Sequence, residues 1–88
     1  MTSLAVDPRV AWQTVDGQAV VMDLAEGRVL GLNPLGSFVW TLLSRGADVA
    51  AITGAVTERF DVEPARARED VLAFLGQLRE RRLIAERP

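Results

Sequence analysis

Cysteine, histidine and lysine are all absent from this sequence of 88 residues. Without cysteine, the chain has no disulfide, no thiolate nucleophile and no thiolate ligand for a metal. Without histidine, it lacks the general base of a Ser-His-Asp triad and the most common transition-metal ligand. Without lysine, none of its glycine-containing segments completes the GxxxxGK[ST] loop that binds phosphates. These absences predict a protein that is not an enzyme, holds no metal and needs no cofactor.

Long apolar runs are missing as well. No segment is long enough to cross a membrane, and Met1 to Arg9 lacks the apolar run of a signal peptide. The composition, 49 % apolar and 25 % charged, is typical of a folded domain, and 10 basic against 12 acidic residues give a net charge of -2. An acidic chain lacks the basic surface of a nucleic-acid binder. We therefore expect one cytoplasmic domain over residues 1–88, with its core at about 10–85 and neither nucleic acid nor membrane as partner.

The first third of the chain has the pattern of short strands joined by glycine turns. Asp16-Gly17 between two apolar runs is a strong signal for a type I′ hairpin, because both central residues of that turn need a positive φ. Glu26-Gly27 marks a second turn. The sequence therefore predicts an antiparallel meander of three strands, over Val10–Val15, Gln18–Leu24 and Arg28–Leu32.

Three helices are predicted after the meander. Asn33-Pro34 is a strong start signal, since asparagine caps free amides and proline fits the first helical position. Gly46 supplies a left-handed stop. Asp48 caps a second helix that ends near Phe60, and Pro64 opens the third. The predicted fold class is α+β, a three-stranded antiparallel sheet followed by three helices.

Acidic pairs are the remaining candidates for acid–base chemistry, at Asp61 with Glu63 and at Glu69 with Asp70. Paired carboxylates catalyse reactions only where burial separates their pKa values, and no apolar pocket accompanies these. Glu69 lies near the start of the third helix, where it complements the helix dipole. We therefore predict no catalytic residue.

The third predicted strand is the surface that most favours a function. An outer strand of a meander has an unpaired edge, to which an extended chain can add through main-chain hydrogen bonds. This strand is charged only at Arg28 and contains Gly31, which either packs under a helix or permits close approach by another backbone. If the third helix lies beside the edge, its Val71, Phe74 and Leu78 would provide side-chain pockets. The alternative is that these three residues belong only to the core.

Arginines concentrate on the third helix, which suggests a second function. Cations in its last turns offset the free carbonyl ends of the helix, which explains part of the pattern. The same helix is the second of a helix-turn-helix pair, where a DNA-binding protein places its reading residues. Interspersed acids weaken phosphate binding. A winged-helix DNA-binding regulator is thus the alternative, and a subunit whose strand edge pairs with itself is a third option. The arginines are Arg66, Arg68, Arg79, Arg81 and Arg82.

The ordered set of motifs resembles the PqqD family over residues 10 to about 85. The matching segments are Val21-Met22-Asp23-Leu24, Glu26-Gly27, Gly31 to Leu43, Arg59-Phe60-Asp61-Val62, Asp70-Val71, Phe74-Leu75, Leu78 and Leu83-Ile84. The resemblance implies a winged-helix-like RiPP recognition element, which binds the leader segment of a ribosomally made precursor peptide. Its implied partners are that leader and a leader protease or radical-SAM enzyme of the same pathway, with the protein a monomer or weak homodimer.

The resemblance also implies where the leader binds. It adds as a strand to the third strand, against the third helix. The implied peptide-binding residues are Arg28, Val29, Leu30, Gly31, Leu32, Arg66, Asp70, Val71, Phe74, Gln77, Leu78 and Arg81.

The motifs that bear on the type of pathway point in two directions. Two segments, Met22-Asp23-Leu24 and Asn33-Pro34-Leu35-Gly36, are more similar to lasso-peptide recognition proteins than to the pyrroloquinoline-quinone member of the family. That member usually carries a Pro-Glu-Gly turn where this chain has Ala25-Glu26-Gly27. Lasso-type members often carry aromatic residues where this chain has Val29 and Leu30. The precursor peptide and its pathway therefore stay open.

Overall fold

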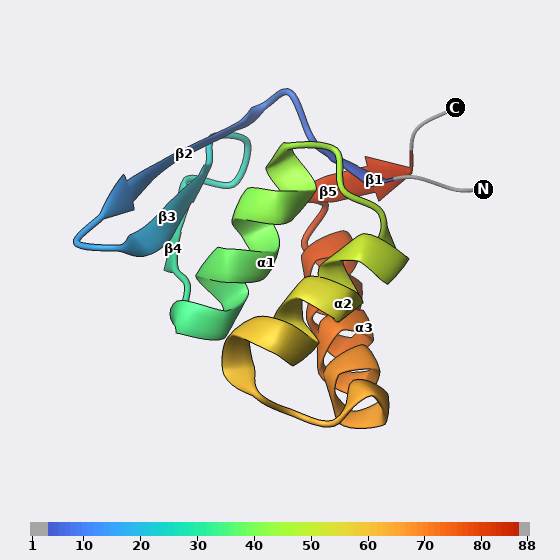
Figure 1. The fold of residues 1–88 in the computed structure, drawn as a ribbon. Helices are drawn as coiled ribbons and strands as arrows, with labels where there is room; N and C mark the ends of the chain where they lie inside the picture. Colours follow the sequence, from blue (N-terminus) through green and yellow to red (C-terminus); the bar gives the residue numbers. More distant parts are fainter. Residues whose placement is uncertain (1–3, 87–88) are drawn as a thin grey trace.

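Three helices and two small antiparallel sheets form the fold of residues 4–86, the part of the chain that this computed structural model describes (Figure 1). In chain order the elements are β1 (Leu4–Val6), β2 (Val10–Val15), β3 (Gln18–Asp23), β4 (Arg28–Gly31), α1 (Pro34–Ser44), α2 (Val49–Phe60), α3 (Pro64–Glu80) and β5 (Ile84–Glu86). The α+β class and the order of a meander followed by helices are confirmed.

The meander forms because its turns carry the residues that their backbone needs. Asp16 and Gly17 have φ of 51° and 82°, as a type I′ turn requires, and they join β2 to β3. The side chain of Asp23 accepts hydrogen bonds from the backbone N–H of Ala25 and of Glu26, at 3.1 and 3.2 Å, which shapes the turn into β4. The sheet order is β2-β3-β4, with β3 in the centre. The second and third predicted strands each end one residue earlier than expected, at Asp23 and at Gly31 in place of Leu24 and Leu32.

The helix starts are also those that the sequence predicts. The side chain of Asn33 accepts a hydrogen bond from the N–H of Gly36 at 2.7 Å, and that of Asp48 accepts one from Ala51 at 2.8 Å. Gly46 has a φ of 90° after α1, which a residue with a side chain rarely adopts. Within residues 4–86, no helix is long and apolar enough to cross a membrane.

The core is centred on α1, which lies between the meander and the α2–α3 pair (Figure 1). Trp40 of α1 is fully buried and makes an edge-to-face contact with Trp12 of β2, with ring centroids 6.2 Å apart. The inner face of the meander, the side turned toward α1, contributes Ala19 and Val21 of β3 to the same core. β3 packs on α1, and pairing with β3 sets the position and orientation of β4.

A second sheet, β1 with β5, was not predicted from the sequence. Val6 lies opposite Ile84 and Leu4 opposite Glu86, and the N–H of Asp7 donates to the carbonyl of Leu83 at 2.9 Å. The pairing joins the two ends of the described chain. It extends the ordered fold on both sides of the expected 10–85 core and holds β5 against the end of α3.

Ser37 joins the end of the meander to α1, and its hydroxyl has a measurable role in stability. The buried Oγ accepts a hydrogen bond from the N–H of Ala19 at 2.8 Å and donates to the carbonyl of Leu32 at 3.1 Å. Replacing Ser37 with alanine leaves both backbone groups without a partner. We expect a loss of about 1–3 kcal/mol in the free energy of unfolding, measured by urea denaturation. Ser44→Ala, which removes a half-buried hydroxyl bonded only to Thr41, is the matched control. Equal stability of the two variants would contradict this role.

Candidate functional site

The outer edge of β4 presents backbone hydrogen-bonding groups that no described residue pairs. The N–H of Leu32 donates to the carbonyl of Ala19 at 2.9 Å, so Leu32 and Ala19 form a hydrogen-bonded pair. This pair determines which residues of β4 bond to β3. Because bonded and non-bonded pairs alternate along antiparallel strands, Leu30 directs its N–H and carbonyl toward β3. Val29 and Gly31 direct theirs away from β3, so these two residues form the free edge of the sheet.

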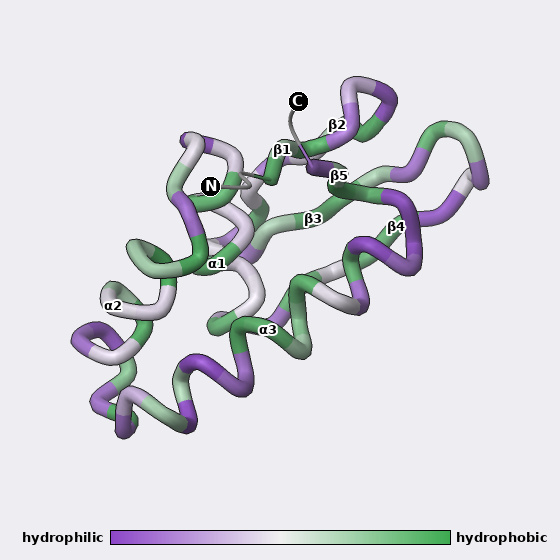
Figure 2. The backbone as a smooth tube through the Cα atoms, turned by 90° about the vertical axis from the view of Figure 1, so that its right-hand side faces the viewer, coloured by the Kyte–Doolittle hydropathy of each residue, from purple (hydrophilic) through white to green (hydrophobic). Residues whose placement is uncertain are grey.

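α3 runs beside this edge, and two hollows separate the helix from the strand. The first has a volume of about 240 Å³ and lies between Arg28 and Leu30 of β4 and Arg81 after the end of α3. The second, of about 230 Å³, lies where Asn33 follows β4, opposite Gln77 on α3. The strand and the helix therefore run in opposite directions, as Figure 2 shows for β4 and the C-terminal half of α3. We call the free edge and these two hollows the groove.

Phe74 is the aromatic residue of the groove. Its neighbours on the same helical stripe, Val71 and Leu78, are 1 % and 3 % exposed and belong to the core, whereas Phe74 is half-buried and lines the second hollow. Gly36 of α1 makes this position possible. A Cβ on Gly36 would lie 3.2 Å from two carbons of the Phe74 ring, closer than ordinary contact allows. The first turn of α1 thus forms one wall of the hollow.

The other predicted site residues divide between the groove and the core. Leu32 is 9 % exposed and faces the core, and Leu30 is half-buried. Asp70 lines the second hollow and pairs with Arg66 at 3.3 Å, one helical turn away, but Arg66 lines neither hollow. The exposed members of the predicted set are Arg28, Val29, Gly31, Arg66, Gln77 and Arg81.

The first turn of α1 contributes to the groove, which was not predicted from the sequence. Leu35, Gly36 and Asn33 all line the second hollow. Asn33 was expected only as a helix cap. The signal that could have found them is Gly36, since a glycine in the first turn of a helix permits close approach by another element.

Charges of both signs line the first hollow. Such exposed charges contribute little stability, because water and salt screen them. They can still select the charges of a ligand, since like charges repel across an interface. The charged lining residues are Asp23, Glu26, Arg28, Glu80, Arg81 and Arg82.

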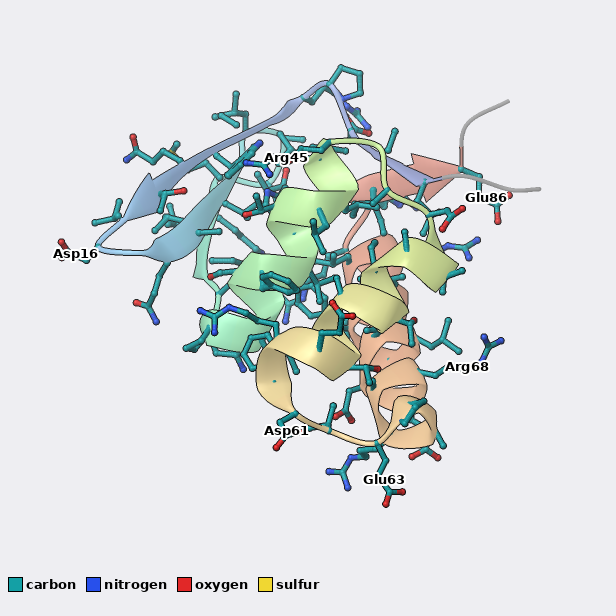
Figure 3. The ribbon with its side chains drawn as sticks, in the orientation of Figure 1. Asp16, Arg45, Asp61, Glu63, Arg68 and Glu86 are labelled. Carbon is teal, nitrogen blue, oxygen red and sulfur yellow. The ribbon has the colours of Figure 1, made fainter. Side chains whose placement is uncertain are left out.

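The acidic pairs considered for catalysis lie outside the groove, apart from Asp70. Asp61 and Glu63 project outward from the loop between α2 and α3 (Figure 3), and Glu69 is also exposed. Next to the first hollow, a side-chain hydrogen bond from Arg9 lowers the pKa of Asp7 below its usual value. Asp7 therefore carries its charge at neutral pH, as a surface partner of Arg9. Exposed carboxylates lack the burial that acid–base catalysis by pairs of acids requires.

An α+β domain with a free strand edge facing a helix has the geometry of a module that accepts an extended chain. The protein belongs to the PqqD family. Residues 18–84 match the family described as coenzyme PQQ synthesis protein D, which confirms the resemblance seen in the sequence. None of the curated proteins matches the chain.

Two solved structures share the fold over nearly the whole chain. One is described as TbiB1 in complex with the TbiA(beta) leader peptide. It has a TM-score of 0.87 and 26% identity, with 91% of this chain and 93% of that chain covered. The other is described as lasso peptide synthetase B1 complexed with the leader peptide. It has a TM-score of 0.87 and 22% identity, with 94% and 98% covered. Both likenesses support the α+β architecture described above.

Proposed function

We propose that this protein is a non-catalytic adaptor that binds the leader segment of a ribosomally made precursor peptide in the groove. The observation that carries the proposal is the free edge of β4, where Val29 and Gly31 direct backbone N–H and carbonyl groups toward the groove beside α3. An extended peptide would pair with these groups as an additional strand. Main-chain hydrogen bonds would then give affinity, and the hollows on the α3 side would give specificity.

The structural relatives support a leader peptide as the ligand. TbiB1 and lasso peptide synthetase B1 are both described as complexes with leader peptides. The description of the second relative also favours a lasso-type pathway over pyrroloquinoline-quinone synthesis. In this proposal the chain acts as one recognition domain in the cytoplasm, as a monomer or weak homodimer. It presents the leader to a protease or radical-SAM enzyme.

DNA binding by α3 is the less favoured alternative. Two of the arginines that prompted it are paired with acids, Arg66 with Asp70 at 3.3 Å and Arg79 with Glu86 at 3.1 Å. The exposed acids Glu69 and Glu80 lie among the arginines of the helix, and the net charge of the chain is -2. Acids on a reading helix repel phosphates and reduce the gain from releasing counterions.

The deciding experiment combines peptide selection with salt dependence. Short random peptides displayed on phage are selected on the wild-type domain, and a synthetic, fluorescein-labelled copy of a selected peptide is titrated. We expect its affinity to change less than about tenfold between about 50 and 200 mM salt, because backbone pairing and apolar contacts release few counterions. Binding through 6–10 phosphates would fall by about 10³–10⁵ over the same range.

Random-sequence duplex DNA is the parallel probe in this experiment. Tight binding to the duplex with the steep slope would overturn the proposal in favour of a DNA-binding regulator. Failure to select any peptide would also count against it.

A further inference from the structure

The face of the meander turned away from α1 carries apolar side chains that no described element covers. Side chains alternate between the two faces of a strand, so Val20 and Met22 of β3 and Val29 of β4 share this side, which we call the outer face. Val29 is 67% exposed, and the other two are half-buried. The outer face ends at the free edge of β4, so it is continuous with the groove.

Gly31 leaves a gap in this face directly at the edge. It lies opposite Val20, and a Cβ added at Gly31 would meet nothing within 4 Å. Its φ is not in the positive range, so the conformation does not require glycine. The space above Gly31, open from the free edge to Val20 and flanked by Val29, is therefore a notch that a larger residue would close. We call it the Gly31 notch.

We infer that the Gly31 notch and the outer face form a second recognition surface for the same bound peptide, an inference that rests on the proposed function. A strand added to β4 places the residue opposite Gly31 with its side chain on the outer face, because paired residues on neighbouring strands share a face. A large apolar side chain there lies over Gly31 and contacts Val20. Large side chains that cover a glycine on the neighbouring strand are a known means of stabilising strand pairs.

The inference defines the class of peptide that the protein takes. The peptide residues on either side of the one over the notch point to the opposite face, toward the hollows beside α3 where Phe74 and Leu30 lie. The segment therefore carries large apolar residues at two consecutive positions, one over the Gly31 notch and one beside Phe74. A peptide read only through the groove would instead alternate between apolar and polar residues.

Gly31→Val is the test, because it should weaken peptide binding if the peptide lies over the Gly31 notch, but should not weaken it if the peptide uses only the groove. Valine meets open space and favours extended backbone, so the fold is kept and the strand edge is better formed. If the peptide lies over the notch, affinity for the fluorescein-labelled selected peptide falls at least about tenfold. The same peptide with alanine at the notch position then binds the wild type weakly but loses little further on Gly31→Val. If the outer face is unused, Gly31→Val binds the selected peptide as well as the wild type or better.

Two variants away from the edge complete the test. Val20→Gln changes the outer face without touching the backbone of β4, and we expect it to weaken binding severalfold. Val15→Gln makes the same change on the outer face at the far end of β2, where Val15 is 45% exposed, and is the control that leaves binding unchanged.

The pattern of failures separates the two claims. The inference would be overturned, and the proposed function would stand, if Val29→Pro abolished binding of the selected peptides while Gly31→Val and Val20→Gln bound them normally. If no selected peptide depends on Val29, both fall.

Discussion

Val29→Pro is expected to lower peptide affinity by at least about tenfold, or ~1.4 kcal/mol, while the domain stays folded. The N–H of Val29 points away from β3, so proline removes a donor that only an added strand would use. Proline is tolerated on the outer side of edge strands for this reason. Circular-dichroism melts and titrations of the selected peptide measure the two effects separately.

Two further proline variants give this experiment its controls. Thr14→Pro places proline at the other free edge of the sheet, since Thr14 lies opposite Ala19, whose backbone bonds are directed toward β4. We expect it to leave peptide affinity unchanged. Leu30→Pro removes an N–H directed toward β3 and should lower the melting temperature, because a ladder bond is lost. Normal binding by Val29→Pro would show that β4 is not the site, and its unfolding would show that the edge is not free.

Local signals in the sequence were enough to predict the meander and the helix starts. Asp16-Gly17 allows few conformations other than the turn observed. Asn33-Pro34 defines a helix start, because the Asn33 side chain accepts a hydrogen bond from Gly36, only three residues further along the chain. The free edge of β4 followed from the number of strands alone, because a meander of three strands has two outer edges. These features depend on residues close together in the chain.

The features that the sequence did not predict depend on distant residues. The pairing of β1 with β5 joins segments about eighty residues apart, and each strand has three residues, too few for a periodic pattern. The division of α3 between core and groove is of the same kind. Phe74 and Leu78 are four residues apart on one stripe, and the approach of α1 at Gly36 decides that Phe74 is the one beside the groove.

Alanine substitutions of Phe74 and Leu78 should therefore affect peptide affinity and the free energy of unfolding to different degrees. Leu78 is 3 % exposed, so Leu78→Ala is expected to cost about 2–5 kcal/mol of the free energy of unfolding. Phe74 is half-buried, and we expect Phe74→Ala to cost about 1–2 kcal/mol, well below the value of ~3–5 kcal/mol for a fully buried aromatic.

The loss of affinity should follow the opposite order. An aromatic side chain that lines a pocket is a typical hot spot, and its truncation costs at least ~2 kcal/mol of binding, or about thirtyfold. Leu78→Ala, measured at a temperature and urea concentration where it is folded, should bind the selected peptide nearly as well as the wild type.

A charge reversal at Asp70 adds a variant that changes selectivity. Asp70 lines the second hollow and is paired with Arg66 on the helix surface, where the pair contributes little stability. Asp70→Arg should therefore leave the urea midpoint nearly unchanged but favour acidic peptides over basic ones in a new selection. Urea denaturation and peptide titration of all three variants give the comparison. If affinity simply follows stability across the set, α3 serves only the core, and the hollow beside Phe74 has no part in binding.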